Sequence, residues 1–183
     1  MKAIVQEAYG SADVLEFKEI DTPVAADDEV LVRVHAASLA AGDYFGMRGA
    51  PFPIRMVIGF PRPKKDHVVG LDVAGHVEAV GKDVTRFKPG DEVFGEGRGA
   101  CAEYACAKEG KLALKPNNLT FEQAAAVPTS ALAALHGLRD HGKGQPGQKV
   151  LINGASGGVG TFAVQIAKVL GAEVTGVCST GNV

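Results

Sequence analysis

The sequence predicts an α/β protein with a β-rich first part and a β-α-β unit near its C-terminal end. Short runs of strand-like sequence, separated by glycine and proline turns, fill about the first 100 residues. The apolar run 149–152 leads instead into a glycine turn and an amphipathic stretch. This order of elements predicts two domains, at 1–124 and 125–183.

The strands of the first domain are expected from alternation of apolar and polar residues. Val30, Val32 and Val34 fall on one face of such a run, and Arg33 and His35 fall on the other, as in a half-buried strand of a barrel or sandwich. Glycines inside these runs indicate bulges or close backbone approach. The expected runs are 2–9, 14–20, 29–37, 68–80, 92–94, 102–107 and 112–114.

Helices are expected after this β-rich region. Thr120 is placed as an N-cap, and 129–138 is rich in alanine and leucine. A glycine and proline loop at 142–147 precedes the β-α-β unit, whose returning strand is 173–177. The apolar face of its helix is expected to carry Val159, Ala163, Ile166 and Leu170, and the opposite face Thr161, Gln165 and Lys168.

Composition excludes several classes of function. The net charge of −2, with acids and bases interspersed, creates no field that would gather nucleic acid or an anionic membrane. No apolar run approaches the roughly 20 residues that span a bilayer. The N-terminal residues show no export signal, and three cysteines make no disulfide framework. We therefore expect a cytoplasmic protein without nucleic-acid or membrane partners.

The glycine turn carries the main functional expectation. Gly157 and Gly160 let the backbone approach a phosphate and let helix and strand pack tightly. The helix N-terminus adds free N–H groups and the positive end of its dipole. We expect a dinucleotide diphosphate to bind along Gly154, Ala155, Ser156, Gly157, Gly158, Val159 and Gly160.

Several motifs in order resemble the medium-chain dehydrogenase/reductase superfamily over essentially the whole chain. They are the segment 70–75 (Gly-Leu-Asp-Val-Ala-Gly), Val80-Gly81, Pro89-Gly90-Asp91 and the glycine turn. Ala37-Ser38-Leu39 before Asp43, the segment 125–128 and the turn are most similar to its zinc-independent quinone oxidoreductase branch. The resemblance implies a GroES-like β-barrel domain, then the first β-α-β unit of a Rossmann domain (a doubly wound parallel sheet), and NADPH as cofactor.

The resemblance also implies that no metal is bound. Zinc-dependent members place a cysteine where this chain has Ala40 and a histidine where it has Leu71, and neither residue present can ligate zinc. Their structural zinc needs four closely spaced cysteines, whereas this chain has Cys101 and Cys106 there. We interpret these two cysteines as small apolar packing residues.

Candidate catalytic residues come from the segment that lies near the nicotinamide in relatives. Tyr44 is the candidate to hydrogen-bond a substrate oxygen, and packing between domains is its alternative role. Asp43 is expected to brace its loop rather than act as an acid. Thr129 matches a position facing the nicotinamide, although helix capping explains it equally. The apolar segment 51–61 is interpreted as a substrate-facing loop or simple packing.

The end of the second parallel strand indicates which coenzyme fits. NAD-specific sites place a carboxylate there, about 20 residues after the glycine turn, whereas this chain has Cys178, Ser179 and Thr180. Two hydroxyls without a repelling carboxylate favour the 2′-phosphate of NADPH. Related sequences often have a basic residue at the position of Gly181. Its absence here weakens the expected binding of the 2′-phosphate.

Hydride transfer to a quinone or an α,β-unsaturated carbonyl is therefore the expected reaction. The sequence stops just after the second Rossmann strand, and we expect a fragment, completed by a missing C-terminal part or by a second copy in a homodimer. One alternative is a truncated, catalytically inactive nucleotide-binding or assembly module. The other is activity of the alcohol dehydrogenase type.

Overall fold

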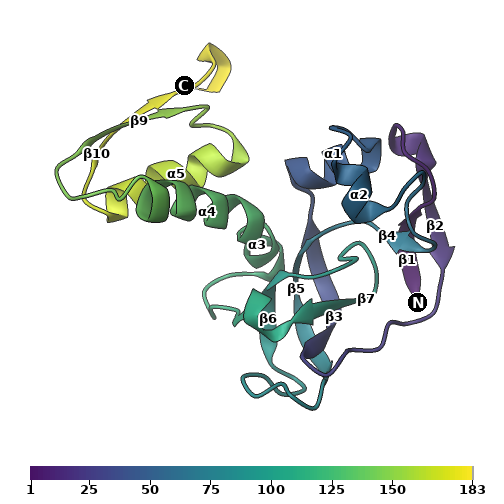
Figure 1. The fold of residues 1–183 in the computed structure, drawn as a ribbon. Coiled ribbons are helices and arrows are strands. Elements are labelled where there is room, and N and C mark those ends of the chain that lie inside the picture. Colours follow the sequence, from purple (N-terminus) through teal and green to yellow (C-terminus); the bar gives the residue numbers. More distant parts are fainter. Residues whose placement is uncertain (183) are drawn as a thin grey trace. The chain divides into compact units, whose positions relative to one another are not determined.

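Within residues 1–182, the computed structural model contains three β-sheets and several short helices (Figure 1). This mixed architecture confirms the predicted fold class. The contacts divide the chain into one compact unit, Met1–Pro128, and a second that begins at Thr129. The finer boundaries of 1–124 and 125–183 stay a prediction.

The first unit contains two antiparallel sheets. The smaller has the order β2-β1-β4 and the larger the order β7-β3-β5-β6-β8. The strands are β1 Lys2–Gln6, β2 Leu15–Glu19, β3 Glu29–Ser38, β4 His67–Val68, β5 Asp72–Val80, β6 Glu92–Glu96, β7 Tyr104–Lys108 and β8 Leu112–Leu114. The helices of this unit are α1 Ala41–Arg48, α2 Ile54–Ile58 and α3 Phe121–Ala125, with 3-10 turns at Ala12–Val14 and Glu109–Lys111.

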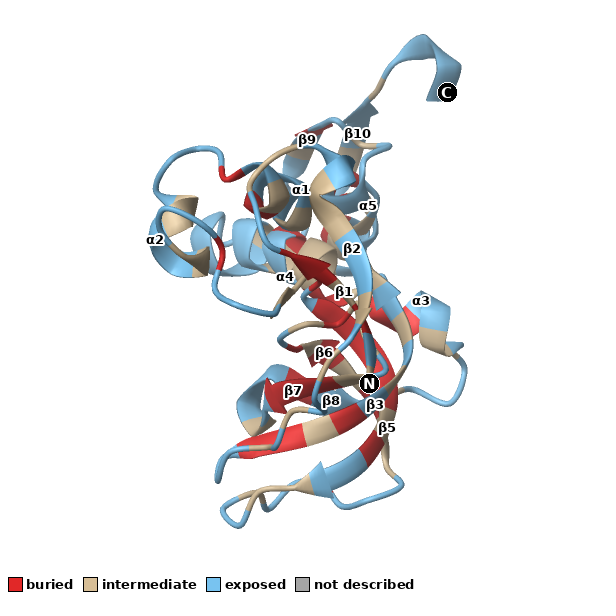
Figure 2. Cartoon of the chain, turned by 90° about the vertical axis from the view of Figure 1, so that its right-hand side faces the viewer, coloured by how far each residue is buried: buried red, intermediate tan, exposed pale blue. Residues whose placement is uncertain are grey.

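The core of the first unit lies on one face of the five-stranded sheet. Buried residues concentrate on β3, β5 and β7 (Figure 2). Val30 and Val32 of β3 are fully buried, whereas Arg33 and His35 are exposed, as the alternation predicts. The core residues packed together are Val30, Val32, Val73, Val77, Phe87, Val93, Ala100, Ala105, Ala107 and Leu112.

The long pair β3 and β5 bends at two register shifts, between Leu31 and Val32 and between Val34 and Ala36. Gly75 lies at the second shift, opposite Val34, and a Cβ on it would collide with the carbonyl of Arg33. A glycine is therefore needed where the two backbones come close. The expected bulge and close approach are confirmed.

The expected strand sequence 68–80, which Gly70 and Gly75 interrupt, is divided between the two sheets. His67 and Val68 form β4, which pairs with β1, whereas β5 begins at Asp72 and belongs to the larger sheet. Gly70 separates the two strands with a φ of +95°, which glycine adopts at little cost. The chain thus changes sheet at this glycine.

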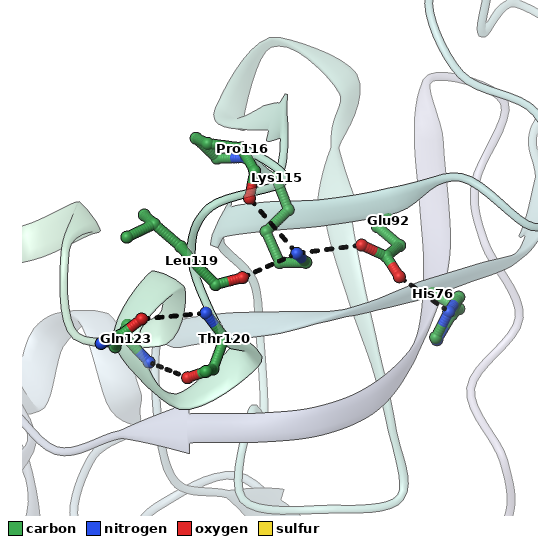
Figure 3. A network of polar contacts seen from close by, with 7 residues as sticks. All are labelled: His76, Glu92, Lys115, Pro116, Leu119, Thr120 and Gln123. Carbon is green, nitrogen blue, oxygen red and sulfur yellow. Dashed lines mark hydrogen bonds and ion pairs between the residues drawn. The ribbon is translucent and has the colours of Figure 1, made fainter.

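Lys115 fixes the connection between β8 and α3 (Figure 3). Its side chain is 6% exposed, and Nζ donates to the carbonyl oxygens of Leu119 (2.8 Å) and Pro116 (3.3 Å) and lies 2.9 Å from Glu92 Oε2. Its ammonium also lies 5.1 Å from the ring centroid of Phe121 in α3. Thr120 caps α3 through its side chain, as expected, by accepting the backbone N–H of Gln123.

The second unit is built from α4 Pro128–Leu135, a π-helical turn His136–His141, β9 Lys149–Asn153, α5 Gly158–Val169, β10 Glu173–Val177 and a 3-10 turn Thr180–Asn182. The two strands are parallel, and α5 packs on them through Ala163 and Ala167. Thr161, Gln165 and Lys168 are exposed, as predicted. Val159 differs: it lies in the first turn, ahead of the packed residues, and is 46% exposed.

No helix within residues 1–182 combines the length and the apolar character needed to cross a bilayer.

We expect Lys115→Met to lower the free energy of unfolding by about 1–3 kcal/mol, because two carbonyls and a carboxylate lose one buried donor. Urea denaturation of the full-length protein measures the loss. Lys111→Met is the matched control: its Nζ lies 2.8 Å from Glu96 but its side chain is 59% exposed, and we expect a cost below about 1 kcal/mol. Equal costs would contradict the role assigned to Lys115.

The same ion pair predicts a pH dependence. The hydrogen bond from Lys115 holds the pKa of Glu92 below its ordinary value. Because the folded-state pKa is the lower one, the stabilisation is complete above the pKa of an unfolded glutamate, about 4.3, and is lost as the pH falls toward the folded value. The stability difference between wild type and Glu92→Gln, measured by urea denaturation, should shrink over that acidic range. A difference independent of pH would contradict this assignment.

Candidate functional site

The glycine turn joins the end of β9 to the start of α5. Gly154 adopts a φ of +76°, and Gly157 is the N-cap of α5 in an extended conformation. Ser156 and Gly158 are exposed, whereas Gly160 is buried. The sequence therefore forms strand, turn and helix N-terminus in the expected order, with the turn open to solvent.

Three backbone amides of the turn already have acceptors within the protein, and one of them, Gly157 N–H, donates to the carbonyl of Gly154 at 3.0 Å. The N–H groups of Gly154 and Ala155 both donate to the carbonyl of Val177, at 2.9 Å each, and tie the turn to the end of β10. The amides of Gly158 and Val159 belong to the first turn of α5, where no preceding helical carbonyl accepts them. An anion would be met by this first turn rather than by the whole segment 154–160.

Gly160 sets the distance between helix and turn. A Cβ on this residue would collide with the carbonyl oxygen of Gly154 and with Cα of Ala155, both backbone atoms. At Gly158, a Cβ would come 3.2 Å from the hydroxyl of Ser130 in α4. Thr129, which precedes Ser130, is half-buried in the first turn of α4. The beginnings of α4 and α5 thus meet beside the turn.

The end of β10 brings two further hydroxyl groups to the same place. Ser179 and Thr180 are exposed after the strand, as is Ser156 in the turn. Asn182 Nδ2 donates to the hydroxyls of Ser179 (2.9 Å) and Ser156 (3.3 Å), and so joins the turn to the strand end. Sequence reasoning missed Asn182, because its partner Ser156 lies 26 residues earlier.

The candidate catalytic residues lie on α1, which follows directly from β3. Asp43 Oδ2 accepts the backbone N–H of Ala40 at 2.7 Å, a contact that braces the start of the helix. Tyr44 is 50% exposed, and its hydroxyl accepts a hydrogen bond from Arg48, whose guanidinium also lies over its ring. The phenol of Tyr44 thus contacts Arg48, one turn further along the same helix.

A cavity of about 870 Å³ lies beside α1 in the first unit. Asp43 and Leu71 line it; among the described residues, Tyr44 does not. The apolar segment 51–61, expected to face substrate or to pack, contributes three side chains to its wall. They are Ile54, Val57 and Ile58 of α2.

The cavity also contains polar groups that sequence reasoning did not select. His67 of β4 lines it, and burial, together with the charge of Lys64, lowers the pKa of this imidazole, which is therefore neutral at pH 7. Gln6 is fully buried at its wall and pairs with His67 across the small sheet. Neither residue stands in a recognisable motif, and the fold alone brings them to α1.

The positions compared with zinc ligands are Ala40 and Leu71, neither of which offers a donor. Cys101 and Cys106 are free thiols, and burial raises the pKa of both. Within residues 1–182, no three His, Cys, Asp or Glu side chains gather into a group that could hold a metal ion.

A family model described as the alcohol dehydrogenase GroES-like domain matches residues 26–136. The chain belongs to this family. Its relatives bear out the resemblance to the medium-chain dehydrogenase/reductase superfamily and to its quinone oxidoreductase-like branch. The match covers the larger sheet, α1 and α2. It therefore includes much of the cavity wall, although Gln6 of β1, which also lines the cavity, lies outside it.

Comparison with known members of the alcohol dehydrogenase GroES-like family extends the similarity over nearly the whole chain. The quinone oxidoreductase of Sus scrofa is 37% identical over 187 residues, covering 98% of this chain and 53% of that protein. The chain spans about half the length of the curated relatives it matches.

Two solved structures are similar to nearly the whole chain. The CurK enoyl reductase is similar with a TM-score of 0.90 and 30% identity, over 98% of this chain and 55% of that one. A mycobacterial protein complexed with NADPH is similar with a TM-score of 0.84 and 30% identity, over 98% of this chain and 52% of that one.

We expect Gly160→Ala to weaken dinucleotide binding by about 10-fold or more, because a Cβ pressed against the turn's backbone displaces α5 from it. Quenching or enhancement of nicotinamide fluorescence in the full-length protein measures the affinity. Gly137→Ala is the matched control in the same unit, since a Cβ there meets no atom within 4 Å. If both variants bind as wild type does, the turn is not the binding site.

Proposed function

We propose that this protein is an oxidoreductase that uses NADPH to reduce a quinone or an α,β-unsaturated carbonyl, without zinc. The observation that carries the proposal is the glycine turn, whose close packing at Gly160 leaves the first turn of α5 open at the end of a parallel strand. The same turn–helix arrangement binds dinucleotide diphosphates in Rossmann proteins.

The residues of the second unit fit a dinucleotide. The amides of Gly158 and Val159 and the hydroxyl of Ser156 would bind the diphosphate. Ser179 and Thr180 follow β10 without a carboxylate, and their hydroxyls would donate to a 2′-phosphate. Bound NADPH would supply a hydride to an electrophilic carbon.

The cavity of the first unit fits an apolar acceptor. Ala40 and Leu71 supply no ligand for a metal Lewis acid, so substrate activation falls to hydrogen-bond donors and positioning. An activated alkene or a quinone suits this chemistry better than a simple alcohol. Tyr44, which lies on α1 but does not line the cavity, remains the candidate donor to a substrate oxygen, since its hydroxyl accepts from Arg48 and keeps its own proton. Asp43 holds the start of α1.

The names of similar proteins support the same chemistry. They include a quinone oxidoreductase, an enoyl reductase and a protein complexed with NADPH. The substrate is accordingly proposed as a small molecule. A homodimer, a cytoplasmic location and Thr129 as a nicotinamide neighbour stay predictions.

The full-length protein tests the proposal in two steps. NADPH and NADH are first titrated by nicotinamide fluorescence, and we expect NADPH to bind about 10-fold more tightly or better. Oxidation of NADPH is then followed at its absorbance maximum with 9,10-phenanthrenequinone, methyl vinyl ketone and a simple alcohol–aldehyde pair. We expect turnover with the quinone or the enone, unchanged by a metal chelator.

Three results would contradict the proposal. Tight NADPH binding without turnover would indicate a binding or assembly module. Chelator-sensitive alcohol oxidation would indicate an alcohol dehydrogenase. Equal affinity for both coenzymes would remove the role of Ser179 and Thr180.

A further inference from the structure

The cavity wall formed by α1 and α2 has little core to hold it in place. In α1 the one buried residue is Gly46, and in α2 none of the five residues is buried. Met56 and Val57 are 74% and 78% exposed. Hydrophobic burial therefore contributes little to the position of α2, and other contacts must fix it.

Tyr9, in the loop after β1, supplies such a contact together with Arg55 of α2. The hydroxyl of Tyr9 donates to the carbonyl of Gly59, just beyond α2, at 2.6 Å. Arg55 Nε donates to the carbonyl of Gly49, just beyond α1, at 2.9 Å. The guanidinium of Arg55 lies over the Tyr9 ring, 4.6 Å from its centroid.

The two side chains are interlocked with the end of α1. Gly49 closes that helix with a φ of +60°, and a Cβ on it would meet the Tyr9 ring and Arg55 Nε within 3 Å. The neighbouring carbonyl of Met47 accepts Nε2 of the buried Gln6 at 2.8 Å. The end of β1 and the loop after it thus hold both helices by polar and ring contacts.

Tyr9 and Arg55, with their bonds to Gly59 and Gly49, are called the tether of α2. The face of α2 that the tether orients is apolar. Ile54, Val57 and Ile58 line the cavity, and Ile58 packs near Gly46 of α1, where a Cβ would come 3.1 Å from its Cδ1. Any displacement of α2 would change the width of the cavity on its apolar side. Because the tether is made of two side chains, a single substitution can cause this displacement.

We propose that Tyr9 and Arg55 are positioning residues that set the apolar wall of the substrate cavity, and thereby select acceptors with a bulky apolar group. The inference rests on the proposed quinone or enone reductase function. Neither residue touches the reacting atoms; both act through α2. Their loss should therefore change substrate binding much more than the chemical step.

The test compares a small and a bulky quinone, 1,4-benzoquinone and 9,10-phenanthrenequinone, in the full-length enzyme with saturating NADPH. We expect Tyr9→Leu and Arg55→Met to raise KM for the bulky quinone about 10-fold, with kcat and the KM of the small quinone within about 2-fold. Tyr9→Phe keeps the ring under Arg55 but loses the bond to Gly59, and should give an intermediate KM.

Arg86→Met is the matched control. Arg86 lies over the ring of Phe87, 5.2 Å from its centroid, and is not among the residues that line the cavity. The Arg86→Met substitution removes a comparable cation–aromatic contact and should leave KM and kcat unchanged for both quinones. Equal changes for small and bulky quinones, no change in the Tyr9 and Arg55 variants, or the same change in Arg86→Met would overturn the inference.

Failure of the proposed function would give a different pattern. If wild type binds NADPH but reduces neither quinone, the reductase proposal is wrong. The tether is then judged by amide hydrogen exchange over residues 54–58, which should be about 10-fold faster in Tyr9→Leu than in Arg86→Met. Equal exchange would overturn the positioning role as well.

Discussion

The pairing of β3 with β5 is the constraint on which the first unit depends. Eight residue pairs join the two strands, from Val30 opposite Val80 to Ser38 opposite Asp72, and the glycine at 75 allows the backbones to meet at the bend. β7 and β6 pair with the outer edges of these strands, and α3 packs on both. Since α1 begins three residues after β3 ends, this pairing also fixes where the cavity wall starts.

Away from that sheet, polar contacts replace apolar burial in holding the structure. Lys115 uses its buried ammonium to hold the connection that leads to α3, and Tyr9 with Arg55 holds α2. Such contacts are directional and few, so the segments they hold are easier to move than the buried strands. The helices α2 and α3 of the first unit are therefore held by fewer contacts than the buried strands.

Local sequence patterns predicted the elements whose partners are near in sequence. The alternation around Val30 and the spacing of Gly157 and Gly160 gave the strand and the turn correctly, because each depends on neighbouring residues. The split at Gly70 and the joining of Asn182 to Ser156 depend on partners far along the chain. The exposure of Val159 also differs from the helical periodicity, since the residues through which α5 packs on its strands, such as Ala163 and Ala167, lie further along the helix.

Val177 has a consequence for how a coenzyme would be recognised. Its carbonyl receives the amides of Gly154 and Ala155, so the turn that would bind the diphosphate is bonded to the end of the strand that would meet the ribose. The diphosphate and the ribose of the coenzyme would then bind to two segments that are hydrogen-bonded to each other. Their contributions to affinity would therefore be coupled, so that a substitution at the end of β10 would also affect binding at the turn.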